Sequence, residues 1–274
     1  MLRANGIRLA VMGQASRKVT IMTRNKNPLK PLKSLMPPMS LMLALILAAF
    51  VSISATQPVR AALDPVLEKA GWDEITFDDQ PSNQFTALDG NKPDLEGGVA
   101  LESEKTVSIA FYKTDADLDK TPFLSWQWRV DTPVLNTDLK QKGGDDRSMA
   151  IYVAFPYQPE VASFGEKIKR KAIEALRGKD TPGRVLTYVW GGGAPKRRFV
   201  ENPYTGEYGQ MIFQRTPIDP SGQWLDEKID LKADFIKAFG YEPSSPLYIG
   251  IAADSDDTQA RVKAAARQFQ FSGE

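Results

Sequence analysis

The 274-residue sequence contains no histidine and no cysteine. A Ser-His-Asp triad needs an imidazole base and a Cys-His pair needs both missing residues, so the sequence excludes these forms of nucleophilic catalysis. It also excludes disulfides, a cysteine-linked lipid anchor, and zinc sites built from Cys and His. Any chemistry must therefore rely on carboxylates, Lys, Arg, Tyr or Ser, or on a hard cation held by oxygen atoms.

Acidic residues are absent from the first part of the chain. Of the 35 Lys and Arg and 34 Asp and Glu residues, nine basic and no acidic residues lie in 1–61. This leaves residues 62–274 with 26 basic and 34 acidic residues, a net charge of −8. Because nucleic-acid binding depends on clustered Lys and Arg that contact phosphates, this acidic body predicts no nucleic-acid partner.

Residues 1–61 have the pattern of an export signal. Basic residues precede the apolar run 41–55, and Val59 and Ala61 occupy the −3 and −1 positions of a cleavage site. An uncleaved anchor is the alternative, although a membrane span needs roughly 18 apolar residues and this run has about 15. The basic region is longer than that of a standard signal. Residues 1–21 are therefore either an unusual extension or precede the true start, which is then expected near Met22. We expect a periplasmic or secreted protein that meets the membrane only through this signal.

The body, residues 62–274, is expected to be a single domain, since no repeat and no linker divides it. Apolar runs separated by turn residues predict about ten short strands. The runs lie at 74–77, 98–102, 106–112, 123–130, 149–155, 184–190, 210–215, 247–253 and 268–271. Residues 103–105 are expected to join the second and third of these strands as a hairpin.

Helical spacing of apolar residues occurs only in connections between these strands. It predicts helices over 163–177 and 230–239, and a third is an option over 258–266. Ser163 and Glu166 have the spacing of a capping box, which satisfies backbone N–H groups at a helix start. With helices confined to connections, the sequence predicts an all-β fold. The expected form is a two-sheet antiparallel β-sandwich of jelly-roll type with two or three short peripheral helices.

Aromatic pairs occur on two of the expected strands. Trp126 and Trp128 share one strand face with aliphatic residues, which favours a place in the core over an exposed stacking platform. Tyr188 and Trp190 end a strand just before three consecutive glycines. Glycines let a backbone approach a ligand or turn sharply, so these two rings either rim a ligand site or precede a hairpin turn. We assign Tyr188 and Trp190 to a ligand-binding site, as stacking residues.

An acidic turn precedes the expected strand at 149–155. Asp145, Asp146 and Arg147 follow two glycines there. They either hold a polar ligand or form a solvated turn with an ion pair at the strand edge. We include all three in the ligand-binding site, where they would form hydrogen bonds.

A second acidic segment follows the expected strand at 247–253. Asp254, Asp256 and Asp257 place three carboxylates in one loop. Ca²⁺ takes six to eight oxygen ligands, so such a loop could supply about half of its shell. The alternative is that these side chains accept loop N–H groups or cap a helix that begins at Thr258. We name the three aspartates as the candidate metal ligands.

The chain resembles a bacterial family of proteins known as the domain of unknown function 3047 family. Its motifs occur in order at 124–130 (LSWQWRV), 142–146 (KGGDD), 151–155 (IYVAF), 186–190 (LTYVW), 202–204 (NPY), 222–224 (GQW), 234–240 (DFIKAFG) and 249–258 (IGIAADSDDT). The resemblance implies an exported all-β domain and assigns no activity. Asp257 departs from the asparagine usual in the family, the usual Tyr-Gly-Asp-Ile ending is replaced over 267–271, and the helix expected at 163–177 is longer than the family pattern implies.

The acidic turn, the Tyr-x-Trp strand and the acidic loop occur together in that family pattern. We therefore expect Asp146, Trp190 and Asp254 to meet on one face or at one end of the sandwich. The function expected from them is a binding module for a polar ligand such as a glycan, with Ca²⁺ as the candidate cofactor. A glycan hydrolase that uses two of the carboxylates is one alternative, since that chemistry needs no histidine. A structural envelope protein without a small-molecule site is the other.

Overall fold

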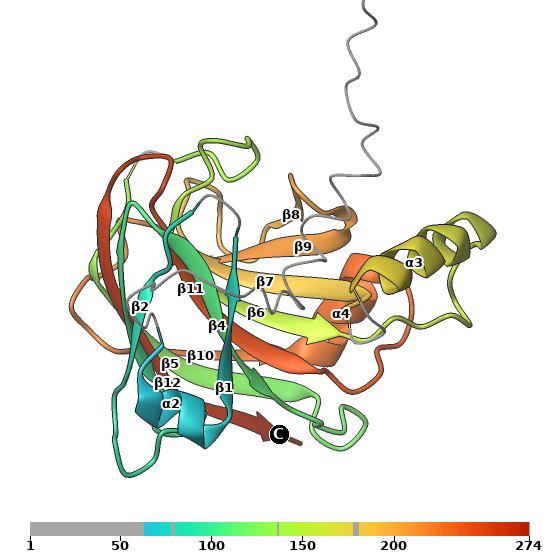
Figure 1. Ribbon diagram of the computed structural model, residues 1–274, viewed down its shortest axis with the longest axis horizontal. Helices are drawn as coiled ribbons and strands as arrows, with labels where there is room; N and C mark the ends of the chain where they lie inside the picture. Colours follow the sequence, from blue (N-terminus) through green and yellow to red (C-terminus); the bar gives the residue numbers. More distant parts are fainter. Residues whose placement is uncertain (1–62, 78–79, 136, 178–180, 274) are drawn as a thin grey trace, which may run out of the picture. The chain divides into compact units, whose positions relative to one another are not determined.

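The computed structural model describes residues 63–77, 80–135, 137–177 and 181–273, which form two stacked β-sheets (Figure 1). The larger sheet has the strand order β1 (Trp72–Thr76), β4 (Val107–Lys113), β11 (Tyr248–Asp254), β6 (Arg147–Phe155), β7 (Arg184–Trp190), β9 (Gly206–Arg215) and β8 (Phe199–Asn202). The smaller sheet has the order β10 (Leu225–Asp230), β5 (Phe123–Thr132), β12 (Arg261–Ser272), β3 (Val99–Glu104) and β2 (Gln84–Ala87). The predicted two-sheet sandwich is confirmed.

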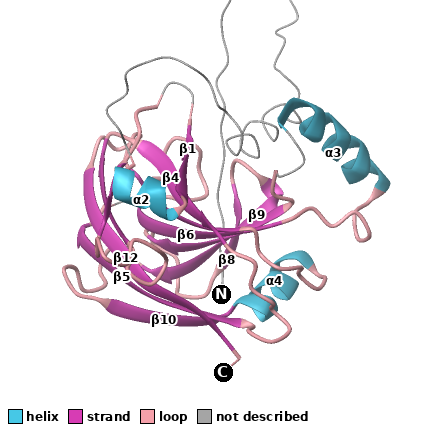
Figure 2. Ribbon diagram, turned by 60° about the horizontal axis from the view of Figure 1, so that its bottom comes forward, coloured by secondary structure: helices cyan, strands magenta, loops and turns pink. Residues whose placement is uncertain are grey.

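Successive strands alternate between the two sheets, from β3 to β6 and again from β10 to β12. This repeated crossing is the arrangement of a jelly roll, as predicted. The strand pairs are antiparallel except β7 and β9, which run parallel. Figure 2 shows the two sheets in side view, with the longest strands of the smaller sheet running beneath the larger one.

The predicted hairpin between β3 and β4 is wrong. The two strands follow one another closely, yet β3 pairs with β2 and β12 while β4 pairs with β1 and β11 in the other sheet. The connection crosses the end of the sandwich, and Lys105 adopts a left-handed backbone conformation there, with φ of 58°. Each strand has one apolar face, and either sheet can bury such a face, so the local sequence does not specify which sheet receives it.

Three helices are present in the described residues, α2 (Pro65–Ala70), α3 (Phe164–Arg177) and α4 (Leu231–Phe239). The capping box of α3 is confirmed: Ser163 N–H donates to Glu166 Oε2 at 2.8 Å, and Glu166 N–H donates to Ser163 Oγ at 3.2 Å. Gly240 ends α4 in the left-handed conformation, with φ of 82°, as a C-terminal glycine should.

The optional helix over 258–266 is not formed, because most of that segment belongs to β12. This strand lies between β3 and β5 and pairs with both. Its alanines 264–266 have high helix propensity, but all three are buried in the strand, and Ala264 and Ala266 belong to the core between the sheets. Hydrogen bonds to a strand on each side and burial in the core outweigh the local preference.

The core lies between the sheets and is rich in aromatic rings. Trp126 and Trp128 of β5 are 1% and 0% exposed, so the prediction that they belong to the core is confirmed. The Trp128 ring centroid lies 5.3 Å from that of Trp190, and the Trp126 centroid lies 5.5 Å from that of Tyr188. These ring contacts join β5 of the smaller sheet to β7 of the larger one.

The expected export signal lies outside the described residues, and so do the apolar run 41–55 and the expected start near Met22. Within the ranges described above, no helix combines the length and the apolar character needed to cross a membrane.

Candidate functional site

The candidate site begins where the end of β11 meets the start of β6. The two strands are antiparallel neighbours, so Asp254 at the end of one pairs with Arg147 at the start of the other. The register shifts by one residue between this pair and the pair of Ala252 with Ala150. An extra residue in β6 of this kind, a β-bulge, turns the Arg147 side chain to the same sheet face as Asp254.

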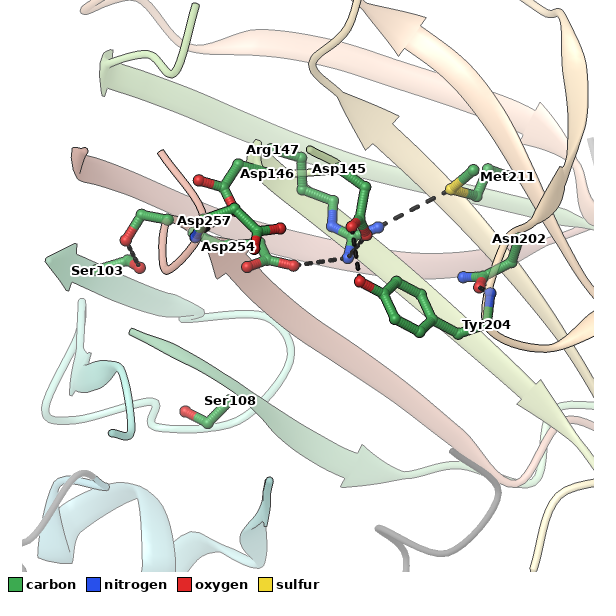
Figure 3. A network of polar contacts seen from close by, with 12 residues as sticks. Ser103, Ser108, Asp145, Asp146, Arg147, Asn202, Tyr204, Met211, Asp254 and Asp257 are labelled. Carbon is green, nitrogen blue, oxygen red and sulfur yellow. Dashed lines mark hydrogen bonds and ion pairs between the residues drawn. The ribbon is translucent and has the colours of Figure 1, made fainter. Parts of the chain in front are cut away.

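Arg147 is the centre of a buried ion-pair network (Figure 3). Its Nη2 lies 2.9 Å from Asp254 Oδ2 and 3.5 Å from Asp145 Oδ2, and the residue is only 6% exposed. A third contact, from Nη1 to the sulfur of Met211 at 3.9 Å, extends the guanidinium over β9. Gly191 makes room for this side chain, because a Cβ there would lie 3.1 Å from the Cβ of Arg147.

Tyr204, in the turn between β8 and β9, belongs to the same network. Its hydroxyl donates to Asp145 Oδ1 at 2.8 Å and accepts from the N–H of Gly143 at 3.4 Å. Burial, together with the hydrogen bond and charge of Asp145, raises the pKa of Tyr204. Tyr204 is not among the residues predicted for the site, although the Asn-Pro-Tyr segment at 202–204 was a signal that could have pointed to it.

Asp146 orders the loop between β11 and β12. Its carboxylate accepts the backbone N–H of Asp257 at 3.3 Å and that of Thr258 at 2.7 Å, and it also accepts the Thr258 hydroxyl. The acidic turn before β6 and the acidic loop after β11 therefore form one structure. Of the three residues expected to meet on one face or at one end, Asp146 and Asp254 do so, whereas the Trp190 side chain lies in the core.

Three carboxylates in this structure are placed to share a cation. Oxygens of Asp146, Asp254 and Asp256 all lie within 4.8 Å of one another. This set differs from the expected ligands Asp254, Asp256 and Asp257, since Asp146 takes the place of Asp257. The side chain of Asp257 is exposed and lies near Gly143, a Cβ on which would be 3.9 Å from Asp257 Oδ1.

The carboxyl of Asp254 is strongly perturbed. Burial raises its pKa well above the ordinary value; the charge of Arg147 lowers it in part, and the nearby Asp256 and Asp146 raise it again. One of its oxygens, Oδ1, is buried without a hydrogen-bond partner, and so is Nε of Arg147. Buried polar atoms in native proteins are usually hydrogen-bonded, so a ligand, an ion or water at this position would satisfy both atoms.

Tyr188 and Trp190 do not belong to this site. Both side chains point between the sheets, where they are 0% and 1% exposed, and the Tyr188 hydroxyl donates to buried Asp234 at 3.0 Å. The assignment of these rings as stacking residues is therefore corrected: they are core residues. Only the backbone after Trp190, at Gly191, reaches Arg147. The reason is that successive side chains of a strand point to opposite faces, and the residues of β7 that face the core are Leu186, Tyr188 and Trp190.

A small hollow lies on the outer face of the larger sheet, along the strands from the carboxylates. It has a volume of about 70 Å³ and is mainly apolar. Tyr152, Tyr208 and Tyr248 are the tyrosines among its lining residues. Tyr152 connects the hollow to the ion pairs, since burial raises its pKa and the charge of Arg147 acts on it in the opposite direction. This hollow was not predicted from the sequence, because the rings predicted to bind a ligand, Tyr188 and Trp190, lie on the opposite face of the sheet.

The pH dependence of stability gives a direct test of the electrostatics. Burial and the charges of Asp256, Asp146 and Asp145 raise the pKa of Asp257 to about 6. An acid with a raised folded-state pKa holds its proton more tightly when folded, so its contribution to stability is full below about pH 4 and is lost as the pH rises through about 6.

In EDTA, the Asp257→Asn variant is therefore expected to be more stable than the wild type at pH 7, by about 1 kcal/mol after allowance for solvent screening of an exposed group. The difference should vanish near pH 4. Urea unfolding at a series of pH values measures it, with Asp89→Asn in a distant exposed loop as the control. A difference that does not change with pH would contradict the raised pKa.

The fold and this carboxylate–arginine cluster define an all-β sandwich protein with a candidate polar site at one end. The family model described as "Protein of unknown function (DUF3047)" matches residues 70–270. The chain belongs to this family, in agreement with the resemblance of its motifs. A comparison with curated proteins gives no match.

Solved structures show weak similarity to the fold. A family 11 carbohydrate-binding module of a cellulase of Clostridium thermocellum is 9% identical with a TM-score of 0.37, and the alignment covers 74% of this chain and 88% of that one. A xyloglucanase domain of a type three effector from Sinorhizobium fredii, in complex with cellobiose, is 7% identical with a TM-score of 0.39 and covers 74% and 91%. Similarities of this size assign no ligand to this chain.

Proposed function

We propose that this protein is an exported binding module whose ligand, a glycan, lies on the outer face of the larger sheet, with Ca²⁺ at its polar end. The observation that carries the proposal is that one sheet face holds both the carboxylate cluster and the tyrosine-lined hollow. Ligand sites combine an apolar surface with a few polar groups that fix orientation. Export is part of the proposal and rests on the sequence of residues 1–61.

A glycan suits this surface because a sugar ring has both an apolar C–H face and hydroxyl groups at its edge. The tyrosines would contact the C–H face, and the carboxylates would accept hydrogen bonds from hydroxyls. The hollow of about 70 Å³ is much smaller than the roughly 300–1,000 Å³ of pockets that enclose a ligand. The glycan would therefore lie across the sheet, with one edge or substituent in the hollow.

The geometry of the carboxylates suits Ca²⁺. Its oxygen ligands lie at about 2.3–2.6 Å, so two ligands on opposite sides of the ion are about 5 Å apart. The oxygens of Asp146, Asp254 and Asp256, all within 4.8 Å of one another, meet this requirement. They would supply three of the six to eight ligands, and water or ligand hydroxyls would supply the others.

Removal of calcium gives the first test. Adding Ca²⁺ to the EDTA-treated protein is expected to raise the Tm, with a stabilisation of about 2.7 kcal/mol at a concentration one hundred times the Kd. Asp256→Asn should remove most of the shift, whereas the control Asp89→Asn should retain it. Thermal unfolding with EDTA and then Ca²⁺ measures both. If the wild-type Tm does not respond to Ca²⁺, calcium is not part of the function.

A glycan panel gives the second test, with titration calorimetry on neutral and uronic-acid oligosaccharides. Tyr152→Ala is expected to weaken binding about tenfold, which corresponds to about 1.4 kcal/mol of lost contact. Tyr112→Phe, on the core side of β4, should bind normally. Failure of every glycan to bind would overturn the proposal. Release of reducing sugar would instead support the hydrolase, although these carboxylates already accept hydrogen bonds from Arg147 and from loop N–H groups.

A structural role is the second candidate function, and burial favours it. Asp145, Asp146 and Arg147 are 2%, 0% and 6% exposed, and they tie the start of β6 to two other segments. In this case the cluster would stabilise the end of the sandwich without a ligand. The two functions differ in outcome: the structural role predicts that neither Ca²⁺ nor any glycan changes the Tm.

A further inference from the structure

Helix α3 extends away from the sandwich (Figure 2). Apolar side chains on it and just before it are exposed to solvent. Phe164 and Ile168 are 81% and 56% exposed, and Val161, just before the helix, is 47% exposed. Phe164 and Ile168 are four residues apart, so they lie on the same face of the helix, one turn apart. An apolar stripe of this kind on a surface helix indicates a contact with another surface.

The acidic and basic side chains of α3 have different surroundings. Its acidic side chains are paired with arginines, since Glu166 lies 2.7 Å from Arg184 and Glu174 lies 2.7 Å from Arg170. Exposed charge is supplied by Lys167, Lys169 and Lys171. Positions 164, 167, 168 and 171 follow the three-and-four spacing of one helix face, so two of these lysines lie beside the two exposed apolar residues.

We propose that α3 docks on the surface of an anionic phospholipid bilayer, with Phe164 and Ile168 inserted between the headgroups. Amphipathic helices that lie in a membrane interface combine an apolar stripe with lysines that extend toward the headgroups. The proposal commits to an anionic surface because the exposed charge of the helix is positive. It does not depend on the glycan or calcium proposals.

The negative charge of the whole body does not prevent this contact. Residues 62–274 have a net charge of −8, but electrostatic interactions in physiological salt are screened beyond about 8 Å. A helix that extends from the sandwich therefore presents its local charge to a membrane. Each lysine near an anionic surface strengthens binding and makes it sensitive to salt.

Because the chain contains no cysteine, a single introduced thiol can be labelled at a chosen position of the protein purified as the cell produces it. An Ile168→Cys variant carries one thiol, to which an environment-sensitive fluorophore is attached. Ile218→Cys is the matched control, since Ile218 is 94% exposed in a loop after β9, elsewhere on the surface. Each labelled protein is mixed with vesicles of phosphatidylcholine alone or of phosphatidylcholine with phosphatidylglycerol. Unchanged far-UV dichroism verifies that each variant folds.

We expect the emission of the fluorophore at position 168 to shift to the blue with the vesicles that contain phosphatidylglycerol, and only with them. The fluorophore at position 218 should show no shift. Higher salt should reduce this shift, and adding Lys167→Gln and Lys171→Gln should weaken vesicle binding about tenfold. Three results would overturn the proposal: no shift at 168, an equal shift at 218, or a shift at 168 that depends on protein concentration without vesicles. The last result would indicate that a second copy of the chain covers the helix.

Discussion

Replacing Arg147 with methionine is expected to lower the free energy of unfolding by about 3–5 kcal/mol at neutral pH. The guanidinium is buried between Asp145 and Asp254, so its removal leaves two buried carboxylates without a cation. The loss should become smaller as the pH falls, because the raised pKa of Asp254 allows this carboxyl to accept a proton. Urea unfolding in EDTA at several pH values measures both effects.

Arg261→Met provides the matched control for this prediction. Arg261 also lies near two carboxylates, those of Glu102 at 3.3 Å and Glu104 at 3.8 Å, but its side chain is 57% exposed. Exposed ion pairs contribute about 0–1 kcal/mol, so its replacement should have little effect. Equal effects of the two substitutions would show that the buried cluster does not stabilise the fold.

The second large effect is expected for Trp190→Ala, which should lower the free energy of unfolding by about 3–5 kcal/mol. The indole is 1% exposed and packs on Trp128 across the two sheets, so its removal leaves a cavity that neighbouring rings cannot fill. Calorimetric or urea unfolding measures the loss. Ligand binding by the folded variant should be normal, because the side chain faces away from the outer sheet face.

Tyr152→Ala should give the opposite pattern. Tyr152 lines the hollow on the outer face, and its removal opens no space between the two sheets. We therefore expect weaker glycan binding with a small change in stability. If Trp190→Ala weakened binding while the protein remained stable, the correction of Trp190 from a stacking residue to a core residue would be wrong.

Features with a local cause could be predicted from the sequence. The strand β7 begins and ends where its apolar run does, and the capping box at Ser163 and the glycine after α4 have the predicted contacts. Each depends on residues within one turn or one strand. Short elements with weak patterns were missed, namely α2, β2, β8 and β10, because four to six residues contain too little periodicity.

The predictions that were wrong concern features whose structure depends on segments far apart in the sequence. Whether β3 and β4 form a hairpin depends on which sheet buries each apolar face, and the strand at 261–272 forms because β3 and β5 lie on either side of it. The same limit applies to the site. The acidic turn and the acidic loop were recognised separately, but their register through β6 and β11, which places Asp146 in the carboxylate group, is a property of the sheet.

The sequence by itself determined the all-β class, the family, and the exclusion of histidine and cysteine chemistry, because composition and local periodicity suffice for these. Only the tertiary structure decided which way each strand faces across the two sheets. This placed Tyr188 and Trp190 in the core and Tyr152 on the outer face. It also joined Arg147 to Asp254, 107 residues later in the chain, because strand pairing and not proximity in sequence brings these charges together.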